Sequence, residues 1–217
     1  MPRGRTRHGP GYRRNSPAVS AVDVTVEVGR RKAFASALEW PGWCRSGRDE
    51  QAALEALLDY RDRFDVVAAG AGLDLPSSPN LRVVERVENP RVSSFGAPYK
   101  RSVHEAGTVP SHELALLESS WRAFDGVIVA RAVAWQPARR GGRDQAAIEA
   151  HVHDVERAYA RSVGVRSAPA EFADPAVVRR RFISALRGEA GDRYWVRRAT
   201  WHVLDHMWEI EDRSISV

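Results

Sequence analysis

The last periodic stretch of the chain, residues 195–213 (WVRRATWHVLDHMWEIEDR), constrains the fold most, because its pattern predicts one long amphipathic helix. At about 100° per residue, the apolar residues and two histidines share one face of that helix. Arg197, Asp205 and Asp212 point elsewhere. The residues on the shared face are Trp195, Ala199, His202, His206, Glu209 and Ile210.

Two histidines on this face have the spacing of metal ligands. His202 and His206 are four residues apart, so their imidazoles lie one helical turn apart and can share one ion. A single core-facing histidine more often only makes a hydrogen bond, and that alternative stays open for both residues. A third histidine facing them would favour a metal site.

Three further helical segments follow Pro110. Ser111 can cap a helix that runs to about residue 134, and Asp144 can cap a second over 145–163. Asp174 followed by Pro175 starts a third. Four helices with short to moderate connections predict a four-helix bundle over 111–217. The expected buried stripes are Leu114, Leu117, Trp121, Phe124 and Val127 on the first helix, and Ile148, Val152, Val155 and Tyr159 on the second.

The second helix offers one inward histidine. His151 and His153 are two residues apart, about 200° of rotation, so only one can face the core. His151 lies beside the apolar stripe, whereas His153 points away. The candidate metal ligands are therefore His151, His202 and His206, a set that leaves coordination positions open for water or substrate. Glu209 is the candidate catalytic residue, although a salt bridge with an arginine is the role we expect first.

The chain before residue 90 has a different pattern. Residues 22–28 alternate apolar and polar side chains, and 32–40 form a second strand, which together predict a hairpin. Residues 41–47 read as a loop containing Cys44, which we expect to be an unreactive thiol. Asp49 caps one helix over 50–64, and 81–87 form a further strand. The prediction is a small β-β-α-β unit.

Charge and composition limit the remaining possibilities. The net charge is +5, but residues 1–20 hold five arginines and no acid, so the rest of the chain is balanced. We therefore expect no nucleic-acid face on the body, and a disordered tail over 1–21 that contacts polyanions weakly at most. One cysteine excludes an internal disulfide, and nothing resembles a signal sequence or a membrane span, so a cytoplasmic location is expected.

The amino-terminal unit, residues 22–90, resembles the HicB-like antitoxin fold. The resemblance rests on Phe34, Ala35, Ala37, Pro41-Gly42, Ser46-Gly47 and the Ala/Leu-rich helix after Glu50. HicB proteins usually continue into a DNA-binding segment, but residues 91–110 read as a connector instead. Only the fold is implied here.

The carboxy-terminal half is similar to the DinB/YfiT-like superfamily of metal-binding four-helix bundles. The matching motifs are Ala150-His151-Val152 and Trp201-His202-Val203-Leu204-Asp205-His206, within a resemblance that covers about residues 111–213. The resemblance implies a divalent metal, most often zinc or nickel. It also implies a low-molecular-weight thiol such as mycothiol, bacillithiol or glutathione as cofactor.

The sequence therefore predicts an α+β chain, with a small β-β-α-β unit followed by a DinB-like four-helix bundle. The leading functional hypothesis is a metal-dependent thiol (mycothiol-type) transferase or hydrolase that acts on a small molecule. The alternative is a non-catalytic regulatory or binding protein that uses the HicB-like unit for partner contact. Whether the chain forms a homodimer is left open.

Overall fold

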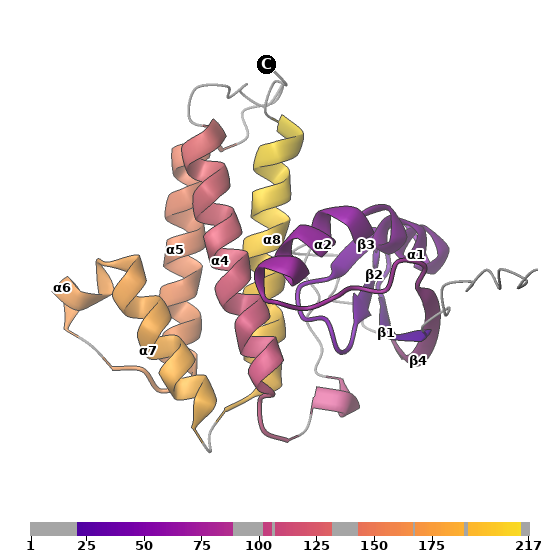
Figure 1. The fold of residues 1–217 in the computed structure, drawn as a ribbon, viewed down its shortest axis with the longest axis horizontal. Coiled ribbons are helices and arrows are strands. Elements are labelled where there is room, and N and C mark those ends of the chain that lie inside the picture. The colour runs from indigo at the N-terminus through magenta and orange to yellow at the C-terminus, as the bar shows by residue number, and fades with distance from the viewer. Residues whose placement is uncertain are drawn as a thin grey trace, which may run out of the picture.

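A computed structural model describes residues 21–88, 102–105, 107–131, 143–166, 168–188 and 191–213. Almost all of the tail expected at 1–21, and most of the connector expected at 91–110, lie outside the described residues. Figure 1 shows the long helices side by side, with a small sheet and its own helices packed against the last of them. The structure is thus of the α+β class.

The sheet has four strands in the order β3-β2-β1-β4. Antiparallel pairing joins β1 (Ala21–Val28) to β2 (Ala33–Ala37), and β2 to β3 (Cys44–Gly47). On its other side β1 pairs in parallel with β4 (Asn80–Glu88). The predicted hairpin is therefore present, and the alternation in β1 buries Val22, Val24 and Val26.

The loop predicted over 41–47 is wrong in its second half, because Cys44–Gly47 forms β3. The preceding residue, Trp43, is fully buried. Its indole N–H donates to the Leu57 carbonyl at 2.8 Å, and its ring stacks on Phe64 with 5.7 Å between centroids. These tertiary contacts hold a Gly- and Pro-rich segment beside β2, where local propensity favours a loop.

The helix predicted over 50–64 is in fact two helices, α1 (Glu50–Asp59) and α2 (Arg61–Gly70). The expected N-cap is confirmed, because the Asp49 carboxylate accepts a hydrogen bond from the Ala52 N–H at 2.9 Å. The chain bends at Tyr60, whose ring packs edge-on against Trp208 at 5.0 Å. The unit is therefore β-β-β-α-α-β rather than β-β-α-β.

The helical part begins with the one-turn η1 (Val103–Glu105) and α4 (Ser111–Arg131), followed by α5 (Gln145–Ser162). The four-residue helix α6 (Pro169–Phe172), which was not predicted, precedes α7 (Pro175–Arg187) and α8 (Arg193–Arg213). The N-caps expected at Asp144 and Asp174 are confirmed by hydrogen bonds of 2.7 and 2.8 Å from backbone N–H groups. Helix α8 contacts both α4 and α5, and α7 packs on α5.

The buried side of α5 differs from the prediction. Val155 and Tyr159 are only half-buried, whereas Glu156 and Ala160 are fully buried beside Ile148 and Val152. On α4, Leu114, Leu117, Trp121 and Phe124 are buried as expected, while Val127 is half-buried.

Helix α8 lies at the centre of the molecule, between the other long helices and the sheet (Figure 1). The side away from the histidines meets the sheet: Trp201 packs edge-on against Phe34, and Asp205 accepts a hydrogen bond from Arg45 at 3.0 Å. At Gly42, with φ at +95°, a Cβ would lie 2.5 Å from Thr200 Cγ2, so this close approach requires glycine.

None of the helices in the described part of the chain combines the length and the apolar character that a membrane crossing requires.

Candidate metal centre

The structure brings the three predicted ligand residues together. His151 comes from α5, and His202 and His206 come from successive turns of α8. Their ring centroids are 4.7 to 5.1 Å apart, and one ring nitrogen from each residue lies within 4.8 Å of the other two. Separations of this size suit three imidazoles around one ion, because zinc–nitrogen bonds are about 2.0–2.1 Å long. That a metal occupies the cluster stays a prediction.

Helix packing explains why these three rings meet. Helices α5 and α8 are in contact, and Ile148 and Val152, which flank His151 on α5, are fully buried. His202 is 7% exposed, whereas His151 and His206 are half-buried. The cluster therefore has one deep residue and two residues nearer the surface.

Burial keeps the deepest ring neutral. The pKa of His202 is well below its ordinary value, first because of burial and then because His206 and His151 lie beside it. The pKa of His151 is also lowered, again mainly by burial and then by Arg143. Neutral imidazoles are the form that binds a metal, so both residues are prepared for ligation at neutral pH.

The hydrogen bonding of His202 is incomplete within the protein. Its Nε2 lies 3.3 Å from Nε2 of His151, and its buried Nδ1 has no hydrogen-bond partner among the described residues. If His202 carries its proton on Nδ1 and His151 does likewise, two lone pairs face one another across 3.3 Å. A cation between the rings turns that repulsion into ligation, so the residues fit a metal.

Glu209 positions His206 from behind. Its carboxylate lies 3.0 Å from His206 Nδ1, and its other oxygen accepts a hydrogen bond from Arg213 at 2.7 Å. The hydrogen bond to His206 is the main reason that the pKa of Glu209 is lowered, with Arg213 adding to it. A proton on Nδ1 leaves Nε2 of His206 free to bind metal, the arrangement common for metal-binding histidines. The expected salt bridge with an arginine is confirmed, and its partner is Arg213.

Two aromatic residues close one side of the cluster. The ring of Tyr159 lies edge-on to His202, with 6.1 Å between centroids, and Trp195 packs on Tyr159 at 5.5 Å. Tyr159 was predicted as part of an apolar stripe rather than as a neighbour of the site. Its position eight residues after His151, about 80° around α5, was the available signal.

A second buried polar cluster was not anticipated. Glu156 on α5 is 2% exposed and binds Arg179 of α7 through two hydrogen bonds of 3.0 Å. The same guanidinium binds Asp125 of α4 at 2.8 Å. Burial raises the pKa of Glu156, while Arg179 opposes that rise. His153, the histidine expected to point away from the metal site, has its pKa lowered by burial and then by Arg179.

Comparison of the chain with family models, with curated proteins and with solved structures finds no match.

Proposed function

We propose that this protein is a metal-dependent enzyme in which His151, His202 and His206 hold one divalent cation, zinc or nickel, in a DinB-like bundle. The convergence of the three rings is the observation that carries the proposal. Three histidines on two helices, supported from behind by a carboxylate, are the ligand set of a catalytic rather than a closed structural metal site.

Three histidine ligands would leave a coordination position open on a divalent ion. Such an ion would lower the pKa of a water or thiol bound there and so supply a nucleophile near neutral pH. The protein contributes the rest: Glu209 fixes the orientation of His206, and Tyr159 and Trp195 shield one side of the cluster. The half-buried His151 and His206 lie on the side that a substrate would approach.

The reaction class that we propose is transfer to or from a small thiol of the mycothiol type, or hydrolysis. Both need one activated nucleophile and a substrate held next to it. The DinB-like motifs favour the thiol reaction, whereas the geometry serves water equally well.

Loading the protein with cobalt distinguishes thiol transfer from hydrolysis. Full-length protein loaded with Co²⁺ should gain visible absorption from the bound ion, and 2-mercaptoethanol should then add a thiolate-to-cobalt charge-transfer band at saturation. Ethanol serves as the oxygen control. A cobalt site that ignores the thiol favours hydrolysis. Failure to bind cobalt or zinc at all would contradict the proposal and favour the non-catalytic alternative.

A further inference from the structure

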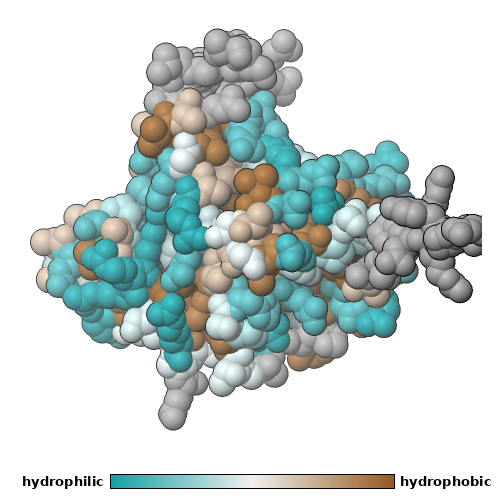
Figure 2. All heavy atoms as spheres, viewed as in Figure 1, coloured by the Kyte–Doolittle hydropathy of each residue, from teal (hydrophilic) through white to brown (hydrophobic). Residues whose placement is uncertain are grey.

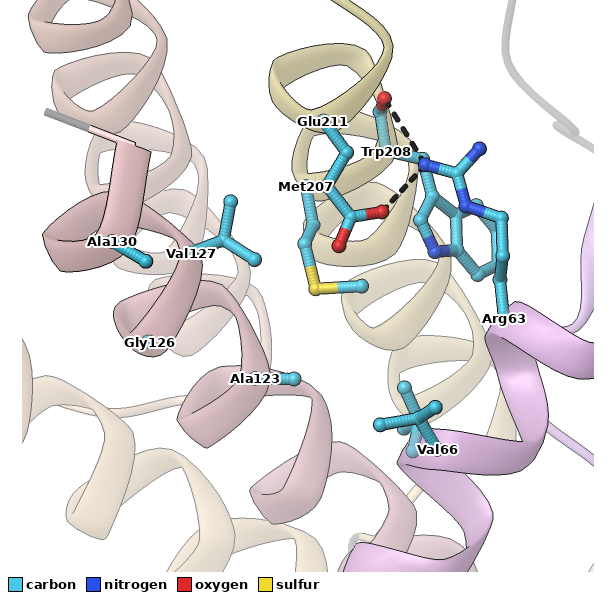
Figure 3. Close-up of a pocket in the computed structure, with 10 residues that line it drawn as sticks. Arg63, Val66, Ala123, Gly126, Val127, Ala130, Met207, Trp208 and Glu211 are labelled. Carbon is cyan, nitrogen blue, oxygen red and sulfur yellow. Dashed lines mark hydrogen bonds and ion pairs between the residues drawn. The ribbon is translucent and has the colours of Figure 1, made fainter. Parts of the chain in front are cut away.

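A cavity of about 350 Å³ lies between α2, α4 and α8, away from the histidines (Figure 3). Around α8, Met207 and Trp208 are rotated by about 140° and 240° from His202, so they face the opposite side of the helix. In Figure 2 apolar residues gather on this face, where the long helices meet the sheet unit. The cavity thus lies between the two parts of the chain and is separate from the candidate metal centre.

The walls of the cavity are mostly apolar. Small residues on α4 leave the space open, and Val66 of α2 and Met207 of α8 line it from the other sides. Val66 is 70% exposed, so the cavity opens to solvent. The small residues on α4 are Ala123, Gly126 and Ala130. Its volume lies within the range of small-molecule sites, which also occur preferentially between structural units.

One buried donor in the wall has no acceptor. Trp208 is 1% exposed, and its indole N–H makes no hydrogen bond within the described part of the chain. Figure 3 shows the indole nitrogen on the ring edge nearer Met207. Leaving a buried donor unpaired has a free-energy cost, so an acceptor that reaches it from the cavity would remove that cost.

The positive charge at the rim is already paired. The Arg63 guanidinium binds Glu211 at 2.5 Å and Asp212 at 2.7 Å, so one positive charge faces two carboxylates. Because this guanidinium is already neutralised, it offers little attraction to an anionic ligand, and a neutral ligand needs no charged partner here.

We propose that this cavity binds a neutral small molecule with an apolar body and a carbonyl oxygen, and that the oxygen accepts the Trp208 indole N–H. The apolar body fills the space beside Ala123 and Met207. Because the ligand touches α2 as well as α4 and α8, its binding also stabilises the contact between the two parts of the chain.

The probe for this proposal is the fluorescent naphthyl ketone prodan, which is neutral and carries a carbonyl. Prodan should bind the full-length protein saturably, with a blue-shifted emission. Ala123→Phe, which fills the cavity, should abolish that binding. Val129→Phe adds the same ring at a position of α4 that is 79% exposed and outside the cavity, and should leave binding unchanged.

The hydrogen bond is tested by Trp208→Phe, which removes the N–H. This variant should bind prodan about 2- to 10-fold more weakly, while an analogue of prodan without the ketone should bind both proteins equally. Thermal melting reports whether each variant folds. His202→Ala should bind prodan as the unchanged chain does, because prodan binding does not depend on the metal site.

Equal binding of prodan to the Ala123→Phe and unchanged proteins would overturn the proposal. So would equal loss for the ketone and its analogue in Trp208→Phe, since that assigns no role to the N–H. A dimer in sedimentation that Ala123→Phe dissociates would also overturn it, because a second copy would then cover the cavity.

Discussion

Two polar clusters are buried among the long helices, and they are satisfied in different ways. Glu156 and Arg179 pair opposite charges, and Asp125 adds a third partner at the rim. His151, His202 and His206 instead bring like groups together, with a buried His202 nitrogen left unpaired within the described residues. The first cluster is complete within the protein, whereas in the second the Nε2 atoms of His202 and His151 face one another across 3.3 Å, where one cation would bind both.

The charge pair contributes to stability, whereas the histidine cluster is available for ligand binding. A buried charge pair whose members satisfy one another supports the packing of α4, α5 and α7, and breaking it costs stability. A cluster of histidines adds little to stability but lies ready for a ligand. Substitutions in the two clusters should therefore affect different measurements: the free energy of unfolding for the charge pair, and metal binding for the histidines.

The largest expected effect is on the stability contributed by the charge pair. Glu156→Ala leaves Arg179 buried with only the exposed Asp125 as partner. We expect the free energy of unfolding to fall by about 3 kcal/mol in urea titrations, at the lower end for a broken buried pair, with metal content unchanged. Glu149→Ala, at a half-buried position on the same helix, is the matched control. A loss of bound metal in Glu156→Ala together with the loss of stability would contradict the separation of the two clusters.

The next largest effect is expected on metal affinity. Glu209→Gln weakens the hydrogen bond that orients His206, and we expect metal affinity to fall about 10- to 100-fold with little change in melting temperature. Glu211→Gln is the control, because Glu211 pairs with Arg63 on the other side of α8. Competition with a chelator of known affinity measures both. Identical metal affinities for the two variants would show that Glu209 does not support the metal site.

Cys44, another buried titratable group, gives a pH-dependent test of burial, because its hydrogen-bond partner, Ser36, is uncharged. Its thiol accepts a hydrogen bond from Ser36 at 3.0 Å, and burial raises its pKa from 9.0 to about 11. The folded state holds this proton more tightly, so the contribution to stability is complete below pH 9 and is lost as the pH rises through 11.

Between about pH 8 and about pH 10.5 this group should therefore lower the free energy of unfolding by about 2 kcal/mol. Cys44→Ala removes only this component, so the difference between the two proteins isolates it from other titrating groups. Parallel pH profiles for the two proteins would show that Cys44 ionises in the folded state as easily as in the unfolded one.

Local signals in the sequence predicted much of the fold. Asp49, Asp144 and Asp174 cap helices as their positions indicated, and the alternation in β1 gave its buried face. Tertiary contacts decided the rest. Strand β3 depends on the burial of Trp43 rather than on its own propensity, and the bend between α1 and α2 comes where Tyr60 packs on α8.

The candidate site was predictable to the same degree. Helical spacing alone placed His202 and His206 together, and rotation around α5 selected His151 over His153. The 3.3 Å approach of two Nε2 atoms depends on how α5 packs on α8, which no local pattern encodes. Glu156 was missed because an acid within an apolar stripe looks exposed until its partner, Arg179 on another helix, is known.

We propose that the three histidines hold one divalent ion. Elemental analysis of full-length protein purified without chelator and dialysed, compared with His202→Ala and His153→Ala, tests it most directly. We expect about one equivalent of zinc or nickel in the unchanged protein and in His153→Ala, and almost none in His202→Ala, with all three still folded by thermal melting. No metal in the unchanged protein, or equal loss in the two variants, would contradict the assignment.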